Sequence, residues 1–465
     1  MTTCLKVTSP YDGEVLQELP CDDSAAIEAA LDRAYSCYRN RKGWIPLHER
    51  VRILEAVAVL MSDRCDELAL QAAREGGKPL MDSQVEAKRA IDGIKLAIET
   101  IRTESGEVVP VNATQAGSQR LAFTQKEPIG VVVAVSAFNH PLNLIVHQVA
   151  AAVAAGCPVI VKPAEDTPVS CKTFVDLLHK AGLPKAWCQF VLPENLELAE
   201  RLVTDPRVGF FSFIGSAKVG WMLRSKLAPG TRCALEHGGA APLILASDAD
   251  LEKALSAVLK AGFYHAGQVC VSVQRVFAEA EVAEEFSERL AELASSLRVG
   301  DPALIETEVG PLIRPSEAGR VAKWVEEAKS EGGKLLNSGG ILDNNCYSPT
   351  VIYNPSYESK VSQQEIFGPV VCVYKSDSIE ASLQHANALP YAFQAAVFTS
   401  NIDTAMLVYR NIDASAVMVN EHTAFRVDSM PFAGLRQSGL GVGGIPHTIR
   451  DMQIEKMMVL NSVNL

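Results

Sequence analysis

Residues 129–162 read IGVVVAVSAFNHPLNLIVHQVAAAVAAGCPVIVK, and this stretch decides the fold. Its two ends, 129–136 and 159–162, are short apolar runs rich in β-branched residues, which predicts two buried strands. Pro141 opens the intervening helix and Gly156 ends it, because proline suits the first turn of a helix and glycine the position after its last turn. Polar residues interrupt the apolar run, so we predict a strand–helix–strand unit rather than a membrane span.

The same alternation of helices and strands extends in both directions along the chain. Helices are predicted at residues 24–40, 47–75, 80–104, 167–180, 250–263, 316–331 and 378–388. Strands are predicted at residues 190–192, 210–214, 234–236 and 243–246, near residue 351, and at 370–374. This order predicts an α/β fold with two Rossmann-like domains, each a parallel sheet covered by helices on both faces.

The composition excludes several classes of protein. The chain has 465 residues, too many for one core, and its net charge of −12 argues against a nucleic acid partner. The same charge means that an anionic ligand would need a locally basic site. Eleven cysteines without a Cys-x-x-Cys pair indicate reduced, mostly buried thiols. The first residues show no apolar signal segment, so we expect a cytoplasmic protein with no membrane partner, and we predict no metal site.

Three residues in separate motifs could together carry acyl chemistry on a carbonyl group. Cys270, in Gly267-Gln268-Val269-Cys270, offers a thiol nucleophile. Glu236, followed by His237-Gly238-Gly239, is a candidate general base. Asn139, in Phe138-Asn139-His140-Pro141, offers a side-chain amide that can stabilise an oxyanion. Each also has a structural alternative: a buried cysteine, a salt-bridged glutamate at a strand end, or an asparagine that turns the chain.

The order and spacing of these motifs resemble the NAD(P)-dependent aldehyde dehydrogenase superfamily, and the resemblance covers nearly the whole chain. It implies that Cys270 attacks an aldehyde and that Asn139 and the backbone N–H of Cys270 stabilise the oxyanion. It also implies that Glu236 activates the water that hydrolyses the thioester to a carboxylic acid. The presence of Glu236 argues against a CoA-acylating relative. The alternatives are a dehydrogenase of neutral aldehydes, a phosphorylating or ester-reducing enzyme, and a catalytically silent structural or binding member.

The resemblance implies where the adenosine half of the cofactor binds. Gly215 and Ser216 lie between a strand and a helix, and free N–H groups at a helix N-terminus favour pyrophosphate. Lys162 follows a buried strand at the place where the family has a lysine on the adenosine ribose. Glu165 would accept a hydrogen bond from the ribose 2′-hydroxyl and would repel a 2′-phosphate. We therefore expect NAD as cofactor in preference to NADP.

Two later motifs complete the predicted site. Glu365-Ile366-Phe367-Gly368-Pro369 resembles the family's motif over the nicotinamide. The resemblance implies that Glu365 holds the nicotinamide ribose hydroxyls and that Phe367 packs against the cofactor. Residues 431–439 match the family's final loop, with Arg436 where lysine is commoner.

The segment before the final loop, residues 420–429, lies at the substrate entrance in the family. Arg426 there could grip an anionic tail with its guanidinium fork, and His140 and Arg89 could face the same cavity. These residues look most like the phosphonoacetaldehyde dehydrogenase branch and predict a short aldehyde with a phosphono, sulfo or carboxylate tail. Val269 stands where anion-handling relatives can carry a cation, which weighs against a doubly charged phosphonate. Arg89 could instead be a solvated helix residue, and Arg426 a structural one.

The resemblance also divides the chain into parts. We expect an NAD-binding domain from residues 1–117 and 129–238 and a catalytic domain from residues 239–442. Residues 118–128 and 443–465 are expected to form a small β oligomerisation arm, because 118–127 and 455–463 alternate like strands and fit neither core. In the family these two segments pair across subunits, so we expect a homodimer or a homotetramer.

Overall fold

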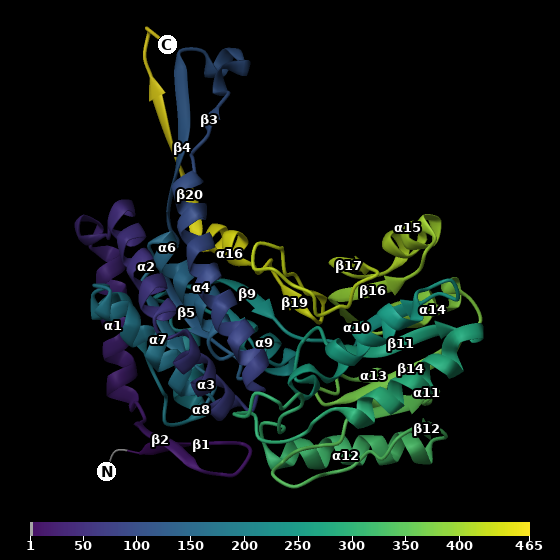
Figure 1. Ribbon diagram of the computed structural model, residues 1–465. Helices are drawn as coiled ribbons and strands as arrows, with labels where there is room; N and C mark the ends of the chain where they lie inside the picture. The colour runs from purple at the N-terminus through teal and green to yellow at the C-terminus, as the bar shows by residue number, and fades with distance from the viewer. Residues whose placement is uncertain (1–2) are drawn as a thin grey trace.

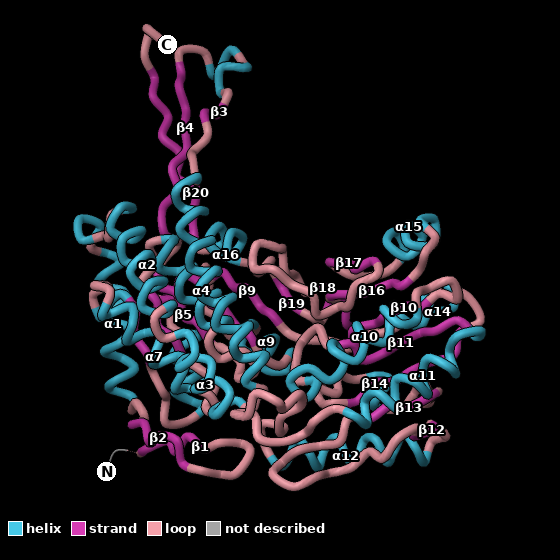
Figure 2. The backbone as a smooth tube through the Cα atoms, viewed as in Figure 1, coloured by secondary structure: helices cyan, strands magenta, loops and turns pink. Residues whose placement is uncertain are grey.

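The computed structural model describes residues 3–465, and the predicted α/β class is confirmed. The chain forms two lobes, each built on its own sheet, and a narrow arm of strands projects from the first lobe (Figure 1). Helices surround the strands of both lobes, whereas the arm is a ribbon of strands with only short helical turns at its tip (Figure 2). A hairpin of β1 (Cys4–Thr8) and β2 (Val15–Pro20) lies at the base of the first lobe.

The first lobe contains a six-stranded sheet with strand order β19-β9-β8-β5-β6-β7. Five strands are parallel, and β19 runs antiparallel to β9. Buried apolar clusters pack against both faces of this sheet. Because both faces are buried, the side chains of its strands are mostly apolar. The strands are β5 (Val131–Val135), β6 (Val159–Lys162), β7 (Cys188–Phe190), β8 (Val208–Ile214), β9 (Arg232–Glu236) and β19 (Gly439–Leu440). The helices are α1 (Ser24–Arg39), α2 (Leu47–Ser62), α3 (Cys65–Gly76), α4 (Leu80–Thr103), α7 (Pro168–Lys180), α8 (Leu196–Thr204), α9 (Ala217–Arg224) and α16 (Ile445–Asp451).

The helix predicted after Pro141 contains a short π-helical segment. It consists of α5 (Asn143–Ile145), the π-helical turn η4 (Val146–Ala150) and α6 (Ala151–Ala155). Gly156 ends it at φ 85°, a left-handed conformation that glycine adopts without steric cost. A π-helical turn widens the helix by one residue and often marks a functional region.

The second lobe contains a seven-stranded sheet with strand order β12-β13-β14-β11-β10-β16-β17. One large apolar cluster lies between this sheet and its helices. The strands are β10 (Ala241–Leu245), β11 (Val273–Glu279), β12 (Lys334–Leu335), β13 (Thr350–Tyr353), β14 (Val370–Ser376), β16 (Gln394–Phe398) and β17 (Ala416–Val419). The helices are α10 (Leu251–Phe263), α11 (Ala280–Ser296), α12 (Pro315–Ser330), α13 (Lys360–Gln363), α14 (Ile379–Asn387) and α15 (Ile402–Asn411). A small ribbon pairs β15 (Tyr391–Ala392) with β18 (Leu435–Arg436).

The arm is a three-stranded sheet with order β20-β4-β3. Strand β4 (Arg120–Pro128) pairs antiparallel with β20 (Gln453–Asn461) along its whole length, and β3 (Val108–Val109) covers part of its other edge. The two predicted arm segments therefore pair with each other inside one chain. That the arm also pairs across subunits, as in the family, stays a prediction.

Several elements differ from those predicted. Residues 47–75 form two helices, because Arg64 leaves the helical conformation at φ −119° and ψ 18°. Helix α16, which lies within the expected arm segment 443–465, packs on α4 and α6 of the first lobe. Strand β19, which lies within the expected catalytic segment 239–442, extends the sheet of the first lobe.

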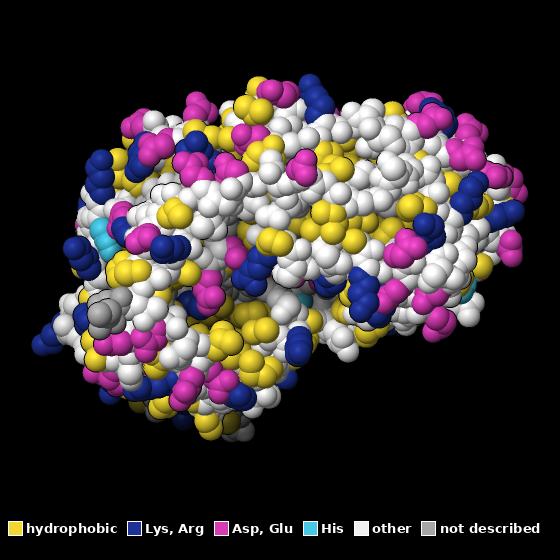
Figure 3. Space-filling view, turned by 90° about the horizontal axis from the view of Figure 1, so that it is seen from below, with side chains coloured by type: hydrophobic (Ala, Val, Ile, Leu, Met, Phe, Trp, Pro, Cys, Tyr) yellow, Lys and Arg dark blue, Asp and Glu magenta, His cyan; other side chains and the backbone are white. Residues whose placement is uncertain are grey.

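Charged side chains of both signs are interspersed on the face seen from below, with no extended run of one sign (Figure 3). Among residues 3–465, no helix has the length and apolar character that crossing a bilayer requires.

Candidate active site

Cys270 lies in a strained turn between α10 and β11. His265, Ala266 and Gly267 adopt left-handed conformations with φ of 49°, 53° and 69°, which is costly for the first two residues. Gln268 holds this turn from two sides. Its Oε1 accepts from the backbone N–H of Ile313 at 3.0 Å, and its Nε2 donates to two backbone carbonyls at 3.3 Å. The turn therefore gives the Cys270 thiol one defined position.

Asn139 joins this turn from the end of β5. Its side chain is buried, and its Nδ2 donates to the backbone carbonyl of Gln268 at 2.9 Å. An amide nitrogen carries two hydrogens, so one remains for a further acceptor. The backbone N–H of Cys270 makes no hydrogen bond to any other residue in the described part of the chain. Two N–H donors are thus available beside the thiol.

Glu236 ends β9 next to the same turn. Burial raises its pKa to about 7, and its electrostatic interaction with Arg426 acts in the opposite direction. Its carboxylate has little free space on one side, because a Cβ atom at Gly443 would overlap Oε1. A carboxyl group with a pKa near neutrality can accept and release a proton under ordinary conditions.

The Cys270 thiol is protonated at neutral pH in this arrangement. Burial raises its pKa to about 12, and the nearby carboxyl groups of Glu365 and Glu236 add to the shift. Attack on a carbonyl requires that this proton leaves, so a proton acceptor or a local positive charge must assist the thiol.

Glu365 approaches the site from the loop before β14. Its Oε1 accepts from the backbone N–H of Gly239 at 3.1 Å, and a side chain at Gly238 would overlap the same oxygen. Burial raises the pKa of Glu365 to about 8. Phe367, two residues later, has φ 48° and packs edge-on against Phe138 with ring centroids 5.9 Å apart.

The residues predicted to hold the adenosine half lie at the carboxyl ends of β6 and β8. The Nζ of Lys162 lies 3.4 Å from the Glu165 carboxylate. Ser216 precedes α9, and its side chain makes no capping hydrogen bond, which leaves the first amides of the helix without a side-chain partner. A lysine, carboxylates and an uncapped helix N-terminus fit the hydroxyl and phosphate groups of a dinucleotide.

Arg426 lies above the catalytic turn. Its guanidinium carbon is 3.9 Å from the centre of the Phe432 ring, and its Nη1 is buried without a hydrogen-bond partner. Phe432 belongs to a small apolar cluster that includes Val269 and touches Cys270. Arg426 also interacts electrostatically with Glu236 and Cys270. Its guanidinium therefore faces the region where a substrate would meet the thiol.

The other two residues predicted to bind an anionic tail are already engaged. Arg89 donates from Nε and Nη2 to the Asp428 carboxylate at 3.1 and 2.8 Å, so two N–H groups of its guanidinium are used in an internal ion pair. His140 contacts the hydroxyl of Tyr264 through Nε2 at 3.0 Å. Burial lowers the pKa of His140 well below its usual value, so it carries no positive charge. Both side chains therefore have protein partners in the structure, and their direct binding of an anion stays a prediction.

Sequence reasoning missed two buried acids that support the site. Asp428 binds Arg89, and Glu86 forms a fully buried ion pair with Lys78. Glu86 also accepts from the backbone N–H groups of Leu142 and Asn143, just after the Asn139 loop, both at 2.9 Å. A signal was present in α4, where charged residues recur at helical spacing on the same stripe as buried alanines and isoleucines.

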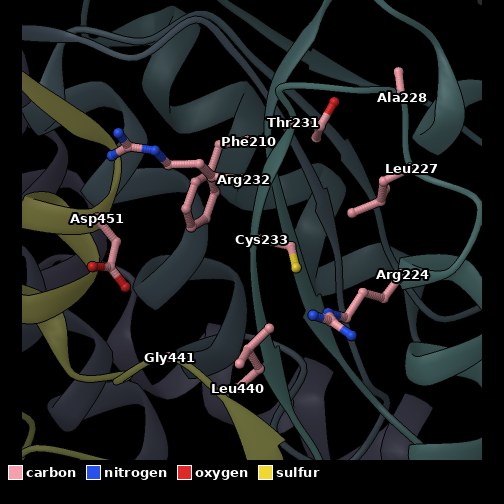
Figure 4. Close-up of a pocket in the computed structure, with 10 residues that line it drawn as sticks. All are labelled: Phe210, Arg224, Leu227, Ala228, Thr231, Arg232, Cys233, Leu440, Gly441 and Asp451. Carbon is pink, nitrogen blue, oxygen red and sulfur yellow. The ribbon is translucent and has the colours of Figure 1, made fainter.

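One cavity lies at the opposite end of β9 from Glu236 (Figure 4). It measures about 680 Å³ and is lined by Arg224, Arg232, Cys233 and Asp451 together with apolar residues. It contains none of the predicted catalytic, cofactor or substrate residues. In residues 3–465, no cluster of three or more His, Cys, Asp or Glu side chains has the arrangement of a metal site.

Comparisons with known proteins agree with this geometry. The sequence model of the aldehyde dehydrogenase family matches residues 2–458 of this chain. A 3-sulfolactaldehyde dehydrogenase of Priestia aryabhattai is 39% identical over 457 residues, which cover 98% of this chain and 95% of the relative.

Two solved structures are similar over nearly their full length. Glyceraldehyde-3-phosphate dehydrogenase of Methanocaldococcus jannaschii, complexed with NADP, has a TM-score of 0.94 and 32% identity, covering 99% of this chain and 100% of that one. Aldehyde dehydrogenase 21 of Physcomitrella patens, in complex with the reaction product succinate, has a TM-score of 0.95 and 33% identity, covering 99% and 96%. The strained thiol turn, the neighbouring amide and carboxylate, and these matches lead to one conclusion: the chain belongs to the aldehyde dehydrogenase family and is an NAD(P)-dependent enzyme that acts on aldehydes.

Proposed function

We propose that this enzyme oxidises a short aldehyde to its carboxylic acid, with Cys270 as nucleophile, Glu236 as general base and water as acyl acceptor. The observation that carries the proposal is the meeting of three chemically matched groups from three separate loops. Asn139 is hydrogen-bonded to the turn that holds Cys270, and Glu236 interacts electrostatically with the thiol.

The steps follow from the chemistry of these groups. The thiol of Cys270 adds across the aldehyde carbonyl, forming a C–S bond, while the Asn139 amide and the Cys270 N–H stabilise negative charge on the oxygen. Oxidation then removes a hydride from the carbon and a proton from the oxygen, which leaves a thioester. Bound NAD(P) supplies the hydride acceptor. Glu236 takes a proton from water, hydroxide attacks the thioester, and the acid leaves as the thiol is restored.

The proposed cofactor residues are Lys162, Glu165, Gly215, Ser216, Glu365 and Phe367, and NAD is the proposed preference. Lys162 is paired with Glu165, and Arg314 is paired with Asp166 through two hydrogen bonds of 2.8 and 2.6 Å. Two cations facing two anions leave no unbalanced positive charge for a 2′-phosphate. Glu165 would accept from a 2′-hydroxyl instead.

The proposed substrate carries a negative charge at the end remote from the aldehyde. Support comes from the buried, unpartnered Nη1 of Arg426, since an unsatisfied guanidinium N–H beside the thiol suits an anionic oxygen. The relative that oxidises 3-sulfolactaldehyde and the structure that holds succinate are consistent with this class of aldehyde. Sulfo and carboxylate aldehydes, and the phosphonoacetaldehyde suggested by the sequence, all belong to it. A preference for neutral aldehydes is the alternative.

We also propose that the enzyme is a homodimer or a homotetramer of a reducing compartment such as the cytoplasm. The outer edge of β20 and its exposed apolar side chains support the first part. The cysteine pattern, eleven cysteines in the sequence without a Cys-x-x-Cys motif, supports the second.

Two substitutions test the mechanism. Cys270→Ala should abolish dehydrogenase activity while retaining NAD binding, because the thiol is the nucleophile and not a cofactor contact. Glu236→Gln should allow a pre-steady-state burst of NADH followed by almost no steady-state turnover. Cys233→Ala is a matched control, because this thiol lies on β9 at the far end from Glu236. Wild-type turnover in Cys270→Ala, or loss of the burst in Glu236→Gln, would contradict the assigned roles.

A further inference from the structure

Asp428 is the centre of a buried hydrogen-bond cluster beside the proposed anion site. It lies between β17 and β18, and only 7% of its side chain is exposed. Arg89 donates two hydrogen bonds to its carboxylate, the Nε2 of His147 lies 2.7 Å from Oδ1, and the Nδ2 of Asn143 donates at 3.3 Å. These partners come from α4, from the π-helical turn η4 and from α5, so three elements converge on one acid.

The carboxylate is ionised in this environment. Burial alone would raise the pKa of Asp428, but hydrogen bonds from His147 and Arg89 outweigh this effect and hold it well below its usual range. Because the Arg89 guanidinium donates two hydrogen bonds to this carboxylate, the two opposite charges cancel and the pair contributes no net charge to the cavity. Burial lowers the pKa of His147 as well, so this histidine adds no positive charge to the pair.

Among the residues predicted to meet the anionic tail, one cation keeps a free N–H donor. His140 is neutral, Val269 is apolar, and Lys78 is paired with Glu86. Arg426 interacts electrostatically with the thiol, and its Nη1 is buried without a hydrogen-bond partner. The carboxyl groups of Glu236 and Glu365 also lie near the thiol, where they raise its pKa, and they would repel additional negative charge.

We propose that Asp428 determines the charge of the accepted substrate: by accepting both hydrogen bonds from Arg89 it leaves Arg426 as the guanidinium with a free N–H for the substrate, so the site selects an aldehyde whose remote end carries one negative charge. A sulfonate or a carboxylate meets this requirement, and a doubly charged phosphonate does not. This inference rests on the proposed function, because it assumes that Arg426 meets the substrate. It assigns Asp428 a role in specificity, acting through Arg89 and without contact with the reacting atoms.

The experiment compares three aldehydes that differ in remote charge. These are sulfoacetaldehyde, phosphonoacetaldehyde and propanal, assayed at about pH 8, where the phosphonate carries close to two negative charges. Each kcat/KM is divided by the value for propanal in the same variant, so that a general loss of activity cancels. The wild type should favour the sulfonate over the phosphonate by about tenfold or more, since the second charge has no partner.

Two variants should move this ratio in opposite directions. Asp428→Asn frees the Arg89 guanidinium and should raise the relative kcat/KM for the phosphonate, narrowing the gap by about tenfold. Arg89→Met leaves the Asp428 carboxylate unbalanced and should widen the gap. The double variant Arg89→Met/Asp428→Asn removes both charges and should return to the wild-type ratio. If Asp428 only supports the fold, all three aldehydes lose activity in proportion and the ratios stay fixed, which overturns the inference.

The result also separates this inference from the proposed function. If the wild type prefers propanal, or if Arg426→Ala affects propanal and sulfoacetaldehyde equally, the proposed anionic substrate is wrong. If Arg426→Ala removes the preference for sulfoacetaldehyde but Asp428→Asn leaves the sulfonate-to-phosphonate ratio unchanged, the anion site stands and only the role of Asp428 is wrong.

Discussion

Burial controls the protonation of the Cys270 thiol and of two carboxyl groups near it. It raises the pKa of Cys270 to about 12, of Glu365 to about 8 and of Glu236 to about 7. Each of these groups is therefore less acidic than it would be in water, and Glu236 gives up its proton most readily among them. This order suits Glu236 as the proton acceptor near neutral pH.

We predict that single residues around Lys162 determine the choice of coenzyme. NAD should give a higher kcat/KM than NADP, because Glu165 and the paired charges nearby disfavour a 2′-phosphate. Glu165→Ser should narrow the difference by about fivefold to tenfold, the effect of about 1 kcal/mol expected for a partly exposed charge pair. Steady-state kinetics with both coenzymes measure this, with the exposed Glu380→Ser as control. A higher kcat/KM with NADP in the wild type would refute the preference.

At the scale of elements, α4 carries a row of buried charges along its face toward the site. Asp82 pairs with Lys260 of α10, Glu86 with Lys78, and Arg89 with Asp428. The acidic end of this row supports the loop that carries Asn139, since Glu86 accepts two backbone N–H groups there. The helix thus connects both lobes and the substrate loop through ion pairs.

Breaking the most buried of these pairs should be costly. Lys78→Met leaves Glu86 without its cation in a fully buried position and should reduce the free energy of unfolding by about 3–5 kcal/mol. Lys95→Met removes the exposed ion pair between Lys95 and Asp92 of α4 and should reduce the free energy of unfolding by about 1 kcal/mol or less. Urea denaturation of both variants makes the comparison. Adding Glu86→Gln to Lys78→Met should recover part of the loss, and equal effects of the two single variants would show that the buried pair is unimportant.

At the scale of the whole molecule, the arm exposes a row of apolar residues. Strand β20 has a neighbour on one edge only, and its Met457, Met458, Val459 and Leu460 side chains are 44–53% exposed. A long apolar edge strand of this kind is normally covered in a soluble protein. A second copy of the chain is the partner that we predict.

Light scattering should therefore give a mass of two or four chains rather than 50.1 kDa. Met458→Glu places a charge on the exposed strand and should shift the protein toward the mass of one chain. Leu196→Glu, at the strongly exposed start of α8, is the matched control and should not change the mass. A wild-type mass of 50.1 kDa would contradict the oligomer.

The sequence predicted what depends on local pattern and missed what depends on long-range pairing. Cys270, Glu236 and Asn139 follow or precede short apolar strands in recognisable motifs, so their place at strand ends was predictable. Asp428 was not, because its role comes from Arg89 and His147, which lie far away in the chain. Strand β19 was missed for the same reason. It has only two residues, which carry no strand pattern of their own, and its partner β9 lies before the whole second lobe in the sequence.

The way that β19 and β20 return to the first lobe has a consequence for biosynthesis. On the ribosome, β9 and β4 emerge long before the strands that cover them, because the entire second lobe is made in between. Until β19 and β20 emerge, the nascent N-terminal lobe keeps two open strand edges, and open edges can pair with the wrong strands. Folding of this lobe is therefore completed only after β19 and β20 have left the ribosome, long after β4 and β9.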